Sequence, residues 1–339
     1  MLTLYKIESG TLAPHAGGLD PIDDFIWIDL NTPSREEELQ VESALGIDVP
    51  TREEMQEIEL SSRLYSEDGA TFMTANILSH TDADDVVLSP MTFILHQKRL
   101  ITVRYTSPRS VTGFVARCSK GGNWSSDLLA IGLIEANIER CADVIERASA
   151  ELDGLSRSIF LPPEAVTEKP GTNTAKKRKR AKTKSKPRDF QRVLDEIGLK
   201  GDLVSKIRDS LVSIQRLLTH YIGQVSSSRS DNAEIASRLK SVSRDVEALR
   251  EHASFMTQKV NFLLDATLGM INIEQNAIIK IFSVAAVIFL PPTLIASIYG
   301  MNFEFMPELN WTFGYPLAIG LMVLSAILPY AFFKRRGWL

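Results

Sequence analysis

The side chain of Asn302 offers an uncharged oxygen donor directly after Gly300-Met301, at the end of a long apolar segment. A short loop carrying Glu304 and Glu308 separates it from a second apolar segment. An amide oxygen hydrogen-bonds to the water shell of a cation, and neighbouring acids raise the local cation concentration. This spacing predicts an ion entrance between two membrane-spanning helices. The alternative for the two acids is an ordinary solvated loop.

The two apolar segments, residues 281–299 and 315–333, contain no charged residue. A helix needs about 20 predominantly apolar residues to cross a bilayer. Basic residues precede the first span (Lys280) and follow the second (334–336), whereas the loop 300–314 has none. The positive-inside rule therefore predicts cytoplasmic termini and an external loop. The alternative is two buried helices of a soluble core.

One face of the first span collects its small and polar residues. Steps of three and four from Asn276 give Ile279, Ser283, Ala286, Leu290, Thr293 and Ser297. Such a stripe indicates either close helix packing or the lining of a pore. Asn276 and Asn302 at its two ends favour a pore, and Pro291-Pro292 predicts a kink within the span. Because two helices cannot enclose a water path, a pore needs several copies of the chain.

The polar part of the chain, up to about Lys280, predicts a domain of mixed α and β structure followed by helices. Alternating apolar residues predict strands at 25–30 and 70–78 and a hairpin formed by 91–96 and 100–105. Ser34, followed by acidic residues, predicts a helix start. Helical periodicity then covers about 125–161 and 190–226. The fold class is therefore α+β, with two membrane spans.

A long helix is predicted from about Asp231 to Tyr299, because no proline interrupts it before Pro291. Small or apolar residues recur in it at alternating steps of four and three: Ile235, Leu239, Val242, Val246, Leu249, Ala253, Met256, Val260 and Leu263. This heptad seam is typical of a helix packed against a neighbour. A helix of this length is about 100 Å long at about 1.5 Å per residue, so it should reach from the soluble part into the bilayer.

The remaining features narrow the class of protein. The formal net charge of -4 is not that of a nucleic-acid binder. The basic run 170–189 predicts a mobile loop between helices, with contact to anionic lipid or nucleic acid and a nuclear-localisation signal as alternatives. Cys118 and Cys141 form no close motif, which predicts reduced thiols. No enzyme is expected, because the histidines are scattered and no Gly-rich phosphate loop is present.

Tyr299-Gly300-Met301-Asn302-Phe303 followed by Met306-Pro307-Glu308-Leu309 resembles the signature loop of the CorA family of magnesium channels. Pro316, the closing residues 334–339 and Leu100-Ile101-Thr102-Val103 add to the resemblance. Its specific part covers about 276–339. The N-terminal half is similar to that family in its order of predicted elements rather than in its amino-acid sequence.

The resemblance implies a homopentameric funnel in the bacterial inner membrane. It implies a cytoplasmic α/β/α domain with a helical extension (1–228), a stalk helix (229–280), a pore-lining span (281–299), an external loop (300–314), an outer span (315–333) and a basic tail (334–339). Gly300, Met301 and Asn302 would form the selectivity filter. Thr293 and Asn276 would form deeper polar rings, and Ile279, Phe282 and Leu290 apolar constrictions. The stripe favours Ser283 over Phe282 at this depth, and Pro292 departs from the family's single proline.

The resemblance further implies transport of Mg²⁺, with Co²⁺ and Ni²⁺ as additional candidate ions and no organic cofactor. Mg²⁺ prefers octahedral oxygen ligands and gives up water reluctantly, so neutral amides suit it better than a thioether such as Met301. Regulatory Mg²⁺ between subunits would need acidic residues, for which the candidates are Asp82, Asp84, Asp85, Asp245 and Asp265.

Two other functions stay open. A zinc transporter of the related branch would share the fold, although Phe303 and the residues 306–309 argue against it, because that branch should have a more glycine-rich loop. A membrane-anchored coiled-coil scaffold would need the heptad seam but not Asn302. Sensitivity of ion flux to Asn302→Ala separates the scaffold from a channel.

Overall fold

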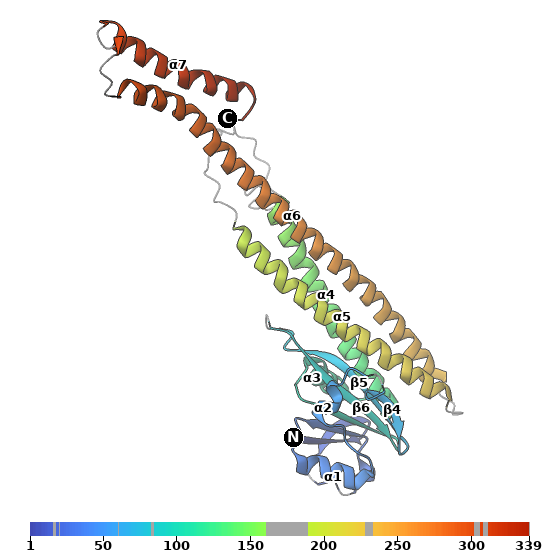
Figure 1. Ribbon diagram of the computed structural model, residues 1–339. Coiled ribbons are helices and arrows are strands. Elements are labelled where there is room, and N and C mark those ends of the chain that lie inside the picture. The colour runs from blue at the N-terminus through green and yellow to red at the C-terminus, as the bar shows by residue number, and fades with distance from the viewer. Residues whose placement is uncertain are drawn as a thin grey trace. The chain divides into compact units, whose positions relative to one another are not determined.

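The computed structural model describes residues 1–15, 18–19, 21–59, 61–82, 85–160, 189–227, 233–301, 306–307 and 311–338 (Figure 1). Residues 170–188 of the predicted basic run 170–189, and Asn302, therefore lie outside the described residues. The chain forms two compact units, Met1–Leu264 and Asp265–Leu339. The first unit contains a β-sheet with helices, and the second contains the apolar C-terminal part.

The first unit is built on a seven-stranded sheet with the order β2-β1-β3-β7-β6-β5-β4. Its strands are β1 (Leu2–Glu8), β2 (Thr11–His15), β3 (Trp27–Asn31), β4 (Leu64–Glu67), β5 (Ala70–Ser79), β6 (Val87–His96) and β7 (Arg99–Arg104). β3 and β7 pair in parallel, and the other neighbours pair antiparallel. The predicted strands at 25–30 and 70–78 are confirmed as β3 and β5, and the predicted hairpin as β6–β7.

The hairpin turn consists of Gln97 and Lys98, both with positive φ (47° and 68°). Positive φ at both central residues is the conformation of a type I′ turn, which matches the twist of the two strands. The turn forms although neither residue is glycine or asparagine. Strand pairing on both sides therefore overrides the local preference of these residues.

One face of the sheet packs against α1 (Arg35–Leu45) and α2 (Arg52–Gln56). Ser34 and Thr51 each form a capping box at the start of their helix. The side chain accepts a hydrogen bond from the backbone N–H of the third helical residue, Glu37 or Glu54, and the side chain of that glutamate accepts one from the backbone N–H of the cap residue. The predicted helix start at Ser34 is confirmed. The η1 turn (Ile22–Asp24) packs at the edge of the same core through Ile22.

Helices cover the opposite face of the sheet: α3 (Arg109–Cys118), α4 (Ser126–Phe160) and α5 (Phe190–Ser227). Trp27 of β3 is fully buried there and lies edge-on to Phe114 of α3, with ring centroids 6.2 Å apart. Ser210 of α5 donates a hydrogen bond of 2.7 Å to the carbonyl of Asn76 on β5. The domain therefore has helix, sheet and helix layers, and the helical predictions near 125–161 and 190–226 are confirmed as α4 and α5.

The helix α6 (Ala233–Tyr299) contributes its first part to this unit. Its predicted seam is buried at Leu239, Val242, Val246, Ala253, Met256, Val260 and Leu263. Ion pairs of 2.6 Å tie it to α4 through Arg238 with Glu135 and Lys259 with Asp153. Gln215 of α5 adds a 2.8 Å hydrogen bond to Ser243. The neighbour that the heptad seam requires is thus the α4–α5 pair of the same chain.

The second unit consists of the rest of α6 and α7 (Gly314–Arg335), which runs back beside it (Figure 1). α6 stays helical through Pro291 and Pro292. These two helices are long and apolar enough to cross a membrane, and only 6% of each apolar window is buried within the chain. Helices of a soluble core are mostly buried, so the core-helix alternative does not fit this unit.

Candidate functional site

The end of α6 carries the first two residues of the Gly300-Met301-Asn302 motif. The Gly300 N–H donates to the carbonyl of Ala296 (2.9 Å), and the Met301 N–H donates to the carbonyl of Ile298 (3.3 Å). A Cβ added to Gly300 would lie 3.2 Å from the Ala296 oxygen, which is tighter than ordinary contact. Glycine therefore lets the chain leave the helix directly at the motif.

Apolar and aromatic residues surround this turn. A hollow of about 360 Å³ lies between the end of α6 and the start of α7, with Tyr299, Gly300, Trp311, Gly314 and Tyr315 among its lining residues. Met301 itself is 48% exposed. Asn302, Glu304 and Glu308 lie outside the described residues, so their predicted roles stay predictions.

The face of α6 that packs within the second unit is marked by burial. Val284 is 2% exposed, and Ile288, Pro291, Ile295 and Tyr299 are half-buried at steps of three and four. Ala318 of α7 is buried as well, at 6% exposure. α7 runs beside this part of α6 (Figure 1) and is the other helix described in this unit, so we infer from their burial that these α6 residues face it.

The predicted stripe of α6 lies on the other side of that helix. Ala286, Leu290, Thr293 and Ser297 each follow a residue of the α7-facing side by two positions. Two residues turn an α-helix by about 200°, so the stripe points away from α7. All stripe residues are exposed in the single chain: Asn276, Ile279, Ser283, Ala286, Leu290, Thr293 and Ser297. Phe282, beside the stripe, is also 71% exposed.

Thr293 directly follows the two prolines within α6. A proline has no N–H, so Pro291 and Pro292 leave two carbonyls of the preceding turn without their helical donors. The Thr293 hydroxyl donates 2.8 Å to the carbonyl of Phe289. Phe289 is not one of the two carbonyls freed by the prolines, which by helical spacing are those of Val287 and Ile288. The Thr293 oxygen lies on the stripe, where it can accept a hydrogen bond from water.

The acidic residues predicted to bind regulatory Mg²⁺ do not come together within one chain. Asp82 accepts charge-assisted hydrogen bonds of 2.6 Å from Arg109 and from Arg140. Asp84 lies outside the described residues, and Asp85, Asp245 and Asp265 are exposed. In the part of the chain that the structure describes, no three Asp, Glu, His or Cys residues lie close enough to hold a metal ion.

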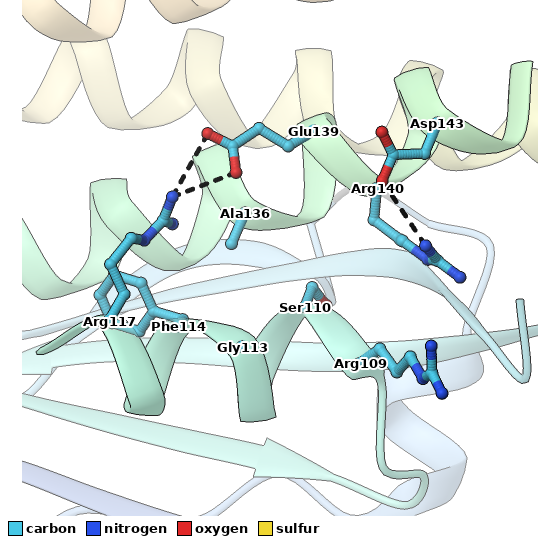
Figure 2. Close-up of a pocket in the computed structure, with 9 residues that line it drawn as sticks. All are labelled: Arg109, Ser110, Gly113, Phe114, Arg117, Ala136, Glu139, Arg140 and Asp143. Atoms are coloured by element: carbon cyan, nitrogen blue, oxygen red, sulfur yellow. Dashed lines mark hydrogen bonds and ion pairs between the residues drawn. The ribbon is translucent and has the colours of Figure 1, made fainter. Parts of the chain in front are cut away.

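A hollow of about 320 Å³ lies between α3 and α4 (Figure 2), and its lining includes Arg109 and Arg140, the two partners of Asp82. Arg117 of α3 lies 3.1 Å from Glu139, and Arg140 lies 3.5 Å from Asp143, so the carboxylates on α4 face guanidinium groups. A divalent cation would have to displace these arginines. The hollow therefore does not suit a cation within a single chain.

Sequence reasoning missed Arg109 and Arg140 as the partners of Asp82. Arg109 begins α3 directly after Pro108, and Arg140 lies in the middle of α4. No local spacing links these residues to position 82, because three different elements bring them together. The loop after β5 is held further by Arg140, whose Nε donates 2.6 Å to the Thr81 hydroxyl.

Comparison with known proteins places this geometry in a family. Residues 23–335 match the model of the family described as CorA-like Mg²⁺ transporter protein. The chain is 35% identical over 345 residues to the magnesium transport protein CorA of Escherichia coli K12, covering 100% of both chains. It is also 35% identical over 350 residues to the protein of that name from Yersinia pseudotuberculosis, again covering 100% of both.

Among solved structures, the CorA magnesium transporter of Methanocaldococcus jannaschii shares the fold. The TM-score is 0.77 with 17% sequence identity, over 100% of this chain and 99% of that one. The match thus includes the N-terminal α/β domain and both apolar C-terminal helices. The chain therefore belongs to the CorA-like Mg²⁺ transporter family.

Proposed function

We propose that copies of this chain form a gated homopentameric channel in the bacterial inner membrane that carries Mg²⁺, with Co²⁺ and Ni²⁺ as further ions. The observation that carries the proposal is the position of the α6 stripe, which points away from α7 and ends at Gly300-Met301. The 35% identity to magnesium transport proteins over the whole chain supports the choice of ion.

The stripe also supports assembly around an axis. It combines hydroxyls of Ser283, Thr293 and Ser297 with small residues and is exposed in the single chain. Lipid offers no hydrogen-bond donors or acceptors to such a surface, whereas a water-filled axis does. Symmetric copies of α6 would face their stripes to that axis and leave α7 outside.

At the outer mouth, the Gly300-Met301-Asn302 turns would form the filter. A ring of Asn302 amide oxygens would hydrogen-bond to the water shell of Mg²⁺ without removing it, because Mg²⁺ loses water reluctantly. Glu304 and Glu308 would concentrate cations at the entrance. Asn276 would form the corresponding polar ring at the cytoplasmic end of the stripe.

Regulation by cytoplasmic Mg²⁺ is a further part of the proposal. Asp85, Asp245 and Asp265 are exposed, so a second subunit could complete a site at any of them. Asp82 is the weakest candidate, since two arginines already neutralise it. Mg²⁺ at millimolar concentration should raise the unfolding temperature of the wild-type assembly, because a bound ion stabilises the state that binds it. An unchanged unfolding temperature would contradict the proposed regulatory Mg²⁺ site.

The transport function is tested by rescue of a bacterium that lacks magnesium uptake. Wild type should restore growth at low Mg²⁺, and Asn302→Ala should not, at equal expression in the membrane. Purified wild-type protein in liposomes should pass Mg²⁺, and a parallel assay with Zn²⁺ tests the related branch. Rescue by both proteins would show that transport does not depend on Asn302. Liposomes that contain the wild-type protein and stay impermeable to Mg²⁺ would contradict the proposed channel function.

A further inference from the structure

Four cations lie at those ends of the two apolar spans that are away from Gly300. Lys280 precedes the first apolar span on α6, Lys334 and Arg335 end α7, and Arg336 follows it. All four side chains are exposed, and among the described residues none of them forms an ion pair. In the first unit, by contrast, Arg238 and Lys259 each meet a carboxylate at 2.6 Å.

Aromatic rings accompany three of these cations. The Lys280 ammonium lies 5.8 Å from the ring centre of Trp338, Lys334 lies 5.9 Å from that of Tyr330, and the Arg336 guanidinium lies 5.6 Å from that of Phe332. Rings with a polar edge and cations on apolar stems are typical of the headgroup level of a bilayer.

The contact between Lys280 and Trp338 places the cations of both helices at one level. Trp338 also stacks on Phe333, with ring centroids 5.4 Å apart, so the tail folds back against the end of α7. The described acids of this unit are Asp265 and Glu274. Glu274 precedes Lys280 by six residues, which is about 9 Å along a helix, so no described carboxylate of this unit shares this level.

We propose that this basic collar, defined as Lys280, Lys334, Arg335 and Arg336, binds the phosphate of an anionic phospholipid headgroup. Guanidinium and ammonium groups are the side chains that bind phosphate, and arginine does so with two parallel hydrogen bonds. The collar borders directly on the two uncharged spans, where lipid phosphates lie. A headgroup without a compensating amine leaves net negative charge for the collar to neutralise.

The rival partner is a carboxylate from a second copy of the chain. Within the second unit of that copy, the described carboxylates are Asp265 and Glu274, and both precede the apolar span on α6, whereas the collar begins at its boundary. Lipid headgroups are available at that boundary in every assembly. The geometry therefore favours a lipid headgroup over a second copy of the chain as the partner of the collar.

The test uses the purified full chain in detergent micelles at low salt, with phosphatidylglycerol or phosphatidylcholine added in defined amounts. Native mass spectrometry counts the bound lipid, and the unfolding temperature is measured on the same samples. The variant is Lys334→Gln with Arg335→Gln and Arg336→Gln. Its matched control removes three exposed cations of the first unit, as Lys120→Gln with Arg208→Gln and Lys240→Gln.

Wild type and the control variant should prefer phosphatidylglycerol, and the preference should weaken as salt rises. In the collar variant, the preference for phosphatidylglycerol should fall by about 100-fold. Each basic residue near an anionic surface contributes about a factor of five, and the variant removes three of them. The single variant Arg336→Gln should lose part of the preference for phosphatidylglycerol, and it serves as the test if the triple variant does not fold. Inorganic phosphate at equal concentration should not reproduce the stabilisation.

Equal binding of both lipids by wild type would overturn the proposal. Full retention of the preference in the collar variants would also overturn it. Stabilisation by inorganic phosphate alone would assign the collar to a soluble anion instead. A change of oligomeric state in the collar variant, without any lipid preference in wild type, would assign it to a second copy of the chain.

Discussion

Asp29 and Arg104 form a buried ion pair between the parallel strands β3 and β7. Arg104 Nη2 lies 2.8 Å from Asp29 Oδ2, and Nε lies 3.1 Å from Oδ1. The side chains are only 3% and 9% exposed. Thr102 donates 2.7 Å to the same carboxylate and accepts 2.9 Å from the indole of Trp27. The pair thus joins two strands far apart in sequence, and a hydrogen-bond network surrounds its carboxylate.

Asp29→Asn should destabilise the first unit by about 3–5 kcal/mol, because it leaves the Arg104 charge buried without a counter-charge. Thermal unfolding of the purified protein measures the loss. Glu196→Gln serves as control, since its 2.8 Å pair with Arg192 is solvent-exposed and should contribute less than about 1 kcal/mol. Equal stability of Asp29→Asn and wild type would show that this pair makes no net contribution.

Two glycines of α4 should respond oppositely to alanine. A Cβ at Gly132 would lie 2.5 Å from the Phe114 ring, so Gly132→Ala should cost about 1–3 kcal/mol through overpacking. A Cβ at Gly154 would meet no atom within 4 Å, so Gly154→Ala should stabilise the helix by about 0.5–1 kcal/mol. Unfolding temperatures should therefore move in opposite directions, and a common direction would contradict the close approach of α3 to α4.

Both cysteines should be unreactive in the folded protein. Burial raises the pKa of Cys118 to about 11 and that of Cys141 to about 12. The hydrogen bond between the Cys141 sulfur and the Ser210 hydroxyl, 3.8 Å apart, acts in the opposite direction but is the smaller effect. A thiol reagent reacts with the thiolate, so labelling at neutral pH should be slow until denaturant exposes both groups. Rapid labelling of the native protein would contradict their burial.

The same pKa shifts predict a pH dependence of stability. Unfolded thiols lose their protons near pH 9, whereas the folded ones keep them up to about pH 11 and 12. Between these values unfolding releases protons, so this contribution to stability is complete below pH 9 and falls as the pH rises. Substitution of both cysteines by alanine should flatten that part of the stability profile relative to wild type.

Thr293→Val keeps the shape of a stripe residue but removes its hydroxyl. If the stripe lines a water path, Mg²⁺ flux into liposomes should fall about 2- to 10-fold, which corresponds to the loss of one hydrogen bond. Ser325→Ala is the matched control, because this hydroxyl of α7 donates to its own helix at the carbonyl of Met322, 2.8 Å away. Equal flux in both variants would place Thr293 outside the conduction path.

Much of the fold follows from local patterns. Alternation over 70–78, the capping signal at Ser34 and the seam from Leu239 to Leu263 each depend on residues close in sequence, and the structure confirms them. The strands β1, β2 and β4 and the helices α2 and α3 escaped prediction. Strand pairing and packing with distant elements decide these segments more than local periodicity does.

The sequence by itself determined the two apolar spans, the stripe on the first one and the Gly300-Met301-Asn302 motif, because composition and helical period are local properties. Only the tertiary structure decided that the stripe points away from α7, that Asp82 is held by Arg109 and Arg140, and that Lys280 meets Trp338. These relationships join elements distant in sequence, and their geometry depends on how the side chains between them pack, which no spacing along the chain records.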